Sequence, residues 1–331
     1  MAITAQDVNK LRKMTGAGMM DCKKALTEAE GDFDKAIDLI RKRGQQIASK
    51  RADREATEGV ALARTNEARN FGAAIIINCE TDFVAKNESF VAFANQVLDI
   101  AIAKQPADIE ALKALPMEEA TVADLVTRQS GVIGEKIDLA AYEIIKAETV
   151  ASYIHFGNKL ATLVGFNQAG VDAQVGKDAA MQIAAMSPIA VDRESVPQAT
   201  IDHELEVAIE KTKEEQVKGA VEQALKKAGF NLYIAENEEH INEGIMKGNI
   251  TEAQAQEIRD LKAKVAAEKA ANLPEAMVQN IAKGRLNKFF KESTLMEQES
   301  VKDNKKTMAQ VFEEASKGLK ATDLRRLSLG N

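Results

Sequence analysis

Strand-like segments joined by turn-forming residues occur in two separate parts of the chain, and a stretch of helical periodicity follows each part. Alternation over residues 59–66, turn chemistry in NEARN and the buried run GAAIIINC over 72–79 predict one antiparallel β-hairpin. ASYIHF, a turn at Gly157-Asn158 and KLATLVGFN predict a second hairpin over residues 151–167. Apolar residues at helical spacing follow from Ser89 to Lys104 and from Lys177 to Met186. This repeated order of hairpin and helix predicts an α+β core with two related halves, although the two sequences do not visibly match.

The N-terminal residues carry the signals of three short helices. Thr4 and Asp7 have the spacing of a capping box, and glycines interrupt the apolar pattern between the helices. We therefore predict a compact helical module over residues 1–45. Residues 46–56 continue a stretch rich in Lys and Arg, which we interpret as a basic, exposed linker, with nucleic-acid contact as the less favoured alternative.

The core is expected to form from two subdomains. Residues 57–150 are assigned to the first, in which helices are expected over 108–128 and 135–150 after the hairpin. Residues 151–199 and 274–331 are assigned to the second. The segment TDLRRLSLG, near the end of the chain, is expected to return as its last strand.

Residues 200–273 form a predicted helical insert within the second subdomain. Two long amphipathic helices joined by a turn predict an antiparallel helical hairpin or coiled coil. Its apolar stripe includes Ile209, Val217 and Val221. Such a stripe usually packs within its own chain, and self-association through it is the alternative.

The composition argues against several classes of function. The chain has 51 acidic and 44 basic residues, a net charge of −7, no Trp and three Tyr, so neither a broad nucleic-acid surface nor an aromatic stacking platform is expected. The two Cys and three His are scattered, which indicates no zinc site, no disulfide framework and a reducing, cytoplasmic environment. No run approaches the length of a membrane span, and the first residues lack a signal-peptide pattern.

Catalytic motifs are not apparent either. MTGAGMM at residues 14–20 has the glycines of a phosphate-binding loop but lacks the Gly-Lys-Ser/Thr ending and follows a predicted helix. We interpret it as a helix–helix turn, and a phosphate-binding enzyme is the disfavoured alternative. Because no spaced carboxylate pair or nucleophile motif is evident, we predict a protein that is not an enzyme.

The segment NCETDFVAK, residues 78–86, lies between a buried strand and the next helix, a frequent location of functional residues. Thr81 is suited to cap the turn, while Asp82 and Phe83 place a carboxylate beside a large ring. Most such rings fill their own core. The alternative is a wedge, in which the ring enters a partner and the carboxylate perturbs a cation or phosphate site.

Three motifs, in order along the chain, give it a family resemblance. TGAGMMDCKKAL near the N-terminus, NCETDFVAK after the first hairpin and SYIHFGNK at the second resemble the bacterial elongation factor Ts family. Members of that family are guanine-nucleotide exchange factors for elongation factor Tu. The resemblance, over about 1–200 and 274–329, implies a UBA-like N-terminal module, a two-part α+β core and an inserted coil. The insert is expected to be longer here than in other members.

The resemblance also implies a site and a mechanism. The wedge would consist of Thr81, Asp82, Phe83 and Val84. It would press on the GTPase domain of elongation factor Tu and disturb the bound Mg²⁺ and phosphate loop, so that GDP leaves and GTP can bind. No cofactor of the chain's own is implied, because Mg²⁺ and the guanine nucleotide belong to the partner.

Further contacts with elongation factor Tu are implied for six other residues. These are Met19, Met20, Lys23, Ile133, Gly134 and His155. Considered without the family, at least one of the two Met residues is expected in the core, the Ile-Gly pair is expected to open a helix, and the His is expected to be structural.

A helical scaffold without exchange activity is the competing interpretation. Exchange would depend on Asp82 and Phe83, whereas a scaffold that self-associates or docks through its insert would depend on the stripe around Ile209, Val217 and Val221.

Overall fold

The structure, a computed structural model, describes residues 3–118 and 120–330. It divides into two compact units, one formed by the residues up to Val191 together with those from Thr294 onward, and the other by Asp192–Ser293. The helices of the first unit are α1 (Ala5–Thr15), α2 (Met19–Glu28), α3 (Phe33–Lys50), α4 (Asp82–Ala85), α5 (Glu88–Lys104), α6 (Ile109–Ala114), α7 (Val122–Ile133), α8 (Ala173–Met186) and α14 (Met308–Ala315).

The strands of the first unit form two three-stranded antiparallel sheets, ordered β1-β2-β5 and β6-β7-β8, and a short β3-β4 pair. Their bounds are β1 (Glu58–Thr65), β2 (Phe71–Cys79), β3 (Pro116–Met117), β4 (Ala120–Thr121), β5 (Asp138–Lys146), β6 (Thr149–Ile154), β7 (Leu160–Phe166) and β8 (Ala321–Ser328). The two expected hairpins are therefore confirmed as β1–β2 and β6–β7, and the expected last strand is confirmed as β8.

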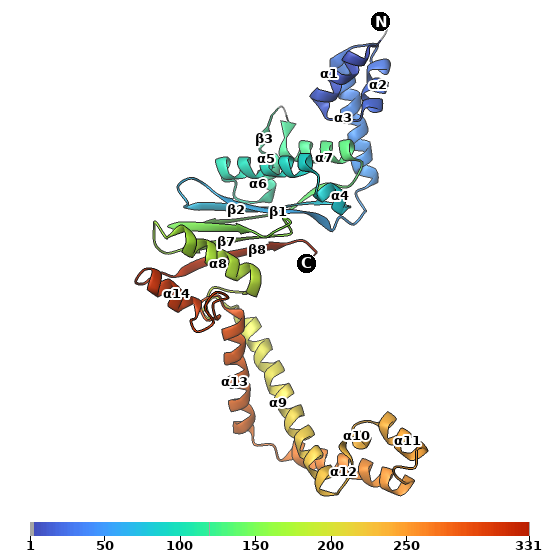
Figure 1. Cartoon of the computed structure of the whole chain (residues 1–331), viewed down its shortest axis with the longest axis vertical. Helices are drawn as coiled ribbons and strands as arrows, with labels where there is room; N and C mark the ends of the chain where they lie inside the picture. Colours follow the sequence, from blue (N-terminus) through green and yellow to red (C-terminus); the bar gives the residue numbers. More distant parts are fainter. Residues whose placement is uncertain (1–2, 119, 331) are drawn as a thin grey trace. The chain divides into compact units, whose positions relative to one another are not determined.

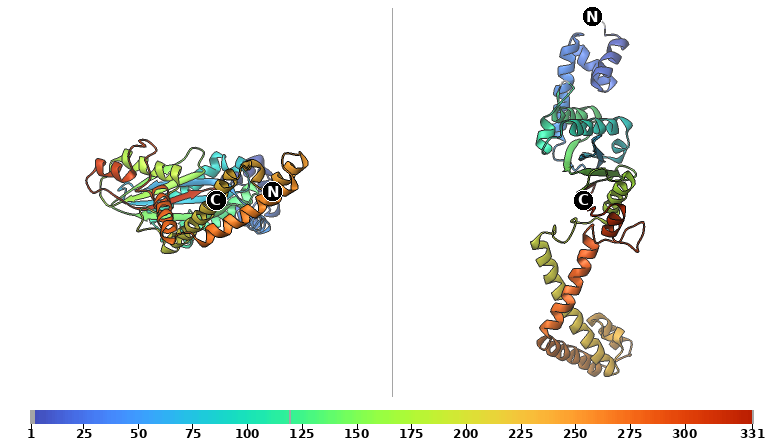
Figure 2. Two further views of the ribbon diagram at one scale, coloured as in Figure 1. Left: turned by 90° about the horizontal axis from the view of Figure 1, so that it is seen from below. Right: turned by 90° about the vertical axis from the view of Figure 1, so that its left-hand side faces the viewer.

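The two larger sheets pack face to face because β1 and β2 are apolar on both sides (Figure 1). Small residues such as Ala61, Ala63 and Ala74 meet the second sheet, and their size allows the sheets to approach closely. The opposite side of β1 and β2 packs under α5 and α7, while α8 and α14 cover the outer side of the second sheet, as the turned views also show (Figure 2). The fold is thus α+β, as the repeated order of hairpin and helix predicts.

Residues 135–150 do not form the expected helix. Asp138–Lys146 is strand β5, and β6 begins at Thr149. The register shift between Ile76 and Ile77 of β2 leaves Ala140 of β5 without an opposing residue in β2. This bulge, in a strand whose two faces are both partly buried, spaces the apolar residues by three and four and so imitates a helix.

The N-terminal module consists of α1, α2 and α3. The capping box of Thr4 and Asp7 is confirmed. The glycine-rich segment is the predicted helix–helix turn, since Gly16 caps the end of α1 with a φ of +69° and Gly18 precedes α2. Helix α3 continues to Lys50, so about half of the expected linker is helical.

Helix α3 also joins the module to the core by crossing α7. The two backbones meet at Gly44 and Gly131, where a Cβ built on Gly131 would lie 2.2 Å from the Cα of Gly44. Only glycine allows this approach.

The second unit is helical throughout and consists of α9 (Gln198–Lys227), α10 (Leu232–Ala235), α11 (Glu238–Met246), α12 (Glu252–Ala271) and α13 (Glu275–Ser293). Helix α9 packs against both α12 and α13. The insert was expected to end at residue 273, whereas the compact unit continues to Ser293, because α13 pairs with α9. The predicted apolar stripe faces other helices of the same unit. Ile209 and Val217 line a cavity with α13, and Val221 packs into a small core with α12.

Candidate functional site

The motif residues Thr81–Val84 form a single helical turn between β2 and α5. Thr81 caps α4, and its Oγ1 accepts a hydrogen bond from the Val84 N–H at 3.4 Å. Val84 is half-buried and packs against the core beneath the turn. Asp82 and Phe83 are thereby presented outward from a turn that is anchored at both ends.

A pair of glutamates fixes the beginning of this turn. The carboxylate of Glu135 accepts hydrogen bonds from the Glu80 N–H at 3.1 Å, the Thr81 N–H at 3.0 Å and the Thr81 hydroxyl at 2.7 Å. In return, the Glu80 carboxylate accepts from the Lys136 N–H at 2.6 Å. Each glutamate therefore holds the backbone beside the other, and we call this arrangement the Glu80–Glu135 clamp.

Basic residues that follow α3 complete the clamp. Arg51 and Arg54 donate to the Glu80 carboxylate at 2.7 and 3.2 Å. The ammonium of Lys136 donates to the carbonyl oxygens of Ala52 and Arg54 at 2.7 and 3.0 Å. The basic segment that the sequence assigned to an exposed linker is thus bound to the base of the 81–84 turn.

The clamp and its surroundings shift several pKa values. The pKa of Glu80 is lowered to about 2, first by the Lys136 N–H and then by Arg51. Burial, assisted by the negative charge of Glu135, raises the pKa of the Cys79 thiol to about 12. The Lys86 ammonium donates to the Asp82 carboxylate at 2.6 Å and lowers its pKa, so Asp82 is ionised at neutral pH.

The ring of Phe83 is 83% exposed. The expectation that it fills its own core is therefore wrong: Val84, one residue later, takes the position facing the core. Removing such a large apolar surface from water would stabilise a complex, and its position beside an ionised carboxylate fits the wedge alternative.

The other candidate residues are distributed over three places. Ile133 packs against the core and Gly134, with a φ of +81°, ends α7, so the expectation that this pair opens a helix is wrong. The pair directly precedes Glu135 and therefore lies beside the 81–84 turn. His155 lies in the β6–β7 hairpin, where its Nδ1 is 3.0 Å from the Tyr153 hydroxyl.

Met19, Met20 and Lys23 lie together on the exposed side of α2. The expectation that at least one Met belongs to the core is wrong, since the two side chains are 54% and 64% exposed. Exposed, flexible Met side chains are suited to an adaptable contact with another protein.

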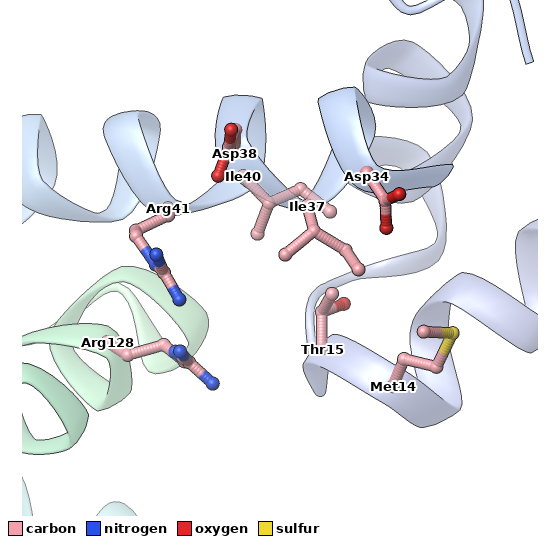
Figure 3. Close-up of a pocket in the computed structure, with 8 residues that line it drawn as sticks. All are labelled: Met14, Thr15, Asp34, Ile37, Asp38, Ile40, Arg41 and Arg128. Carbon is pink, nitrogen blue, oxygen red and sulfur yellow. The ribbon is translucent and has the colours of Figure 1, made fainter. Parts of the chain in front are cut away.

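The chain also has a cavity of about 240 Å³ where α1, α3 and α7 meet (Figure 3). Arg41 from α3 and Arg128 from α7 point into it beside apolar side chains such as Ile37. Within the part of the chain that the structure describes, no three His, Cys, Asp or Glu side chains are grouped so as to hold a metal ion. Among the same residues, no helix combines the length and apolarity needed to span a membrane.

Two features of the site were not found in the sequence. Glu135 carried no recognisable signal, because the groups it binds are more than 50 positions away in the chain. Phe156, at the tip of the β6–β7 hairpin, is 96% exposed. Its place directly before the Gly157–Asn158 turn was the available signal.

A protein-family model described as Elongation factor TS matches residues 80–331, which begin at Glu80 of the clamp and include the 81–84 turn. The chain belongs to the elongation factor Ts family. Its role is therefore in the elongation step of protein synthesis.

Curated relatives named Elongation factor Ts match along the whole chain. The protein of Bacteroides fragilis (strain YCH46) is 51% identical over 330 residues, covering 99% of both chains, and that of Bacteroides thetaiotaomicron is 50% identical with the same coverage. The protein of Amoebophilus asiaticus is 47% identical over 332 residues, covering all of both chains. Because these elongation factor Ts proteins match along the insert as well, the expectation of an unusually long insert does not hold against them.

Proposed function

We propose that the chain is a guanine-nucleotide exchange factor for elongation factor Tu and that it acts without covalent chemistry or a cofactor of its own. The observation that carries the proposal is the exposed Phe83 ring on a turn fixed by the Glu80–Glu135 clamp. A ring held in this way enters a partner at little cost in conformational entropy.

The mechanism follows from the difference between two states of the partner. An exchange factor accelerates release only if it binds the nucleotide-free GTPase more tightly than the GDP-bound one. In the proposed complex Phe83 enters an apolar pocket of the GTPase domain, and the ionised Asp82 disturbs the site of Mg²⁺ and the phosphate loop. Mg²⁺ and the nucleotide are bound by the partner, and loss of Mg²⁺ removes the charge that holds the β-phosphate.

The remaining candidate residues would extend this contact. Met19, Met20 and Lys23 present an exposed, adaptable surface on α2, and His155 lies on an exposed hairpin. Ile133 and Gly134 lie beside the clamp and are proposed to border the contact. Self-association through the insert remains the alternative, because Ile209 and Val217, which line a cavity, and Val221, which packs at the edge of a small core, are only half-buried.

Stopped-flow release of a fluorescent GDP from elongation factor Tu tests the proposal. We expect the wild type to accelerate release and the double variant Asp82→Ala/Phe83→Ala to lose most of the acceleration while remaining folded. Acceleration that survives the double substitution would keep the function but refute the wedge. A folded wild type that does not accelerate release would refute the function.

A further inference from the structure

The N-terminal module is joined to the base of the 81–84 turn by side chains as well as by the chain itself. Arg51, directly after α3, donates to one oxygen of the Glu80 carboxylate at 2.7 Å, and Arg54 donates to the other at 3.2 Å. Only 13% of the Glu80 side chain is exposed, against 28% for Arg51 and 60% for Arg54. The Arg51–Glu80 pair is therefore shielded from solvent and is stronger than an ion pair on an open surface.

Lys136 holds the same segment a second time. Its ammonium donates to the carbonyl oxygens of Ala52 and Arg54 at 2.7 and 3.0 Å, while its N–H donates to the Glu80 carboxylate at 2.6 Å. Lys136 thus bridges residues 51–54 and Glu80. Neither can move away from the other without the loss of several hydrogen bonds.

The helices behind these contacts reinforce the connection. Helix α3 crosses α7 at Gly44 and Gly131 (Figure 1), and α7 ends at Gly134, directly before Glu135. The C-terminal end of α3 therefore leads into Arg51, and that of α7 leads into Glu135. Because packed helices move as rigid elements, the position of the module is linked to that of the clamp.

We propose that Arg51, Arg54 and Lys136 are positioning residues for nucleotide exchange. They hold Glu80, and through it the turn that carries Phe83, in a fixed place relative to the N-terminal module. This inference rests on the proposed function. The three residues act through the turn and do not themselves enter the partner.

A fixed link between module and turn affects one step of exchange more than another. The module, with Met19, Met20 and Lys23, is proposed to bind the GTPase domain whether or not the Phe83 ring has entered its pocket. Entry of the ring costs less conformational entropy when the turn is already in place. Because this gain is realised only as the nucleotide site is disturbed, it raises the rate of release at saturation and leaves the initial binding unchanged.

GDP release at increasing concentrations of the full chain separates these two effects. Elongation factor Tu loaded with fluorescent GDP is mixed with the wild type, with Arg51→Gln/Arg54→Gln or with Arg51→Lys/Arg54→Lys. We expect the Gln variant to lower the saturated rate by about 3- to 10-fold, with the half-saturating concentration within about twofold of the wild type. Each Arg donates to Glu80 through one nitrogen, so the Lys variant can replace both contacts and should recover the rate to within about twofold.

Lys42→Gln/Lys50→Gln is the matched control, because both lysines are exposed on α3 and their loss removes the same charge. It should change neither quantity. The assignment is overturned if the Gln variant keeps the saturated rate of the wild type. It is equally overturned if the control lowers that rate as much as the Gln variant does, because the basic residues would then act by general attraction of the partner.

Failure of the proposed function would have a different signature, since the wild type itself would not accelerate release. Native-state amide hydrogen exchange then decides the positioning role. We expect the amides of Glu80 and Thr81 to exchange faster in the Gln variant than in the wild type, and equal protection in the two proteins would overturn the assignment.

Discussion

The Glu80–Glu135 clamp predicts a graded response to substitution of Glu135. Its carboxylate accepts three hydrogen bonds, from the Glu80 N–H, the Thr81 N–H and the Thr81 hydroxyl. Glu135→Ala removes all three, and at about 1 kcal/mol for each the opening of the turn becomes about 3 kcal/mol easier, or roughly 100-fold more frequent.

Glu135→Gln should be much milder. The amide oxygen can accept from the two N–H groups, and the amide nitrogen can donate to the Thr81 hydroxyl oxygen, which reverses its role. Only the contribution of the charge is lost, for which we expect about 1 kcal/mol, or roughly fivefold more frequent opening.

Native-state amide hydrogen exchange over residues 79–87 measures these openings directly. Glu148→Ala is the control, because Glu148 is exposed and follows β5. We expect protection of the Glu80 and Thr81 amides to fall about 100-fold in Glu135→Ala, a few-fold in Glu135→Gln and not at all in the control. Unchanged protection in Glu135→Ala would show that the clamp does not hold the turn and would refute this reasoning.

Three further predictions concern other parts of the chain. Gly131→Ala should destabilise the first unit by about 1–3 kcal/mol, because its Cβ would lie 2.2 Å from the Gly44 Cα. Gly219→Ala in α9 should stabilise the second unit by about 1 kcal/mol, because its Cβ would meet nothing within 4 Å. Calorimetric unfolding of both variants checks these opposite signs. The pKa of Glu80 is lowered from 4.5 to about 2. The ionised carboxylate therefore stabilises the folded protein by about 3 kcal/mol above pH 4.5, and this contribution is lost as the pH falls toward 2. Glu80→Gln should flatten the acid limb of a stability–pH profile, and an unchanged limb would contradict this. Cys79, buried and with a pKa raised to about 12, should resist iodoacetamide at pH 8 in the native protein and react only after unfolding, as mass spectrometry of the labelled peptide would report.

Local signals in the sequence located most elements of the fold. The capping pair Thr4–Asp7 stands at the start of α1, and Thr81 caps α4, both as expected. These predictions succeed because a cap involves atoms only three residues apart. The hairpins were equally predictable, because each has turn-forming residues between two short apolar segments of strand length.

Predictions that depended on distant partners were less successful. A helix was expected at β5 because a bulge opposite β2 and partial burial on both faces disturb the alternation that identifies a strand. The end of the insert was expected at residue 273 because the pairing of α13 with α9 leaves no mark in the periodicity of either helix.

The sequence by itself determined the α+β class, the positions of the two hairpins and the three motifs that led to the elongation factor Ts family. Only the tertiary structure decided that Phe83 faces outward while Val84 faces the core, and that Glu135 holds a turn that lies more than 50 positions earlier in the chain. The physical reason is the range of the interactions. Caps and strand periodicity act within a few residues, whereas burial and the partners of a carboxylate are set by chain segments that meet only after folding.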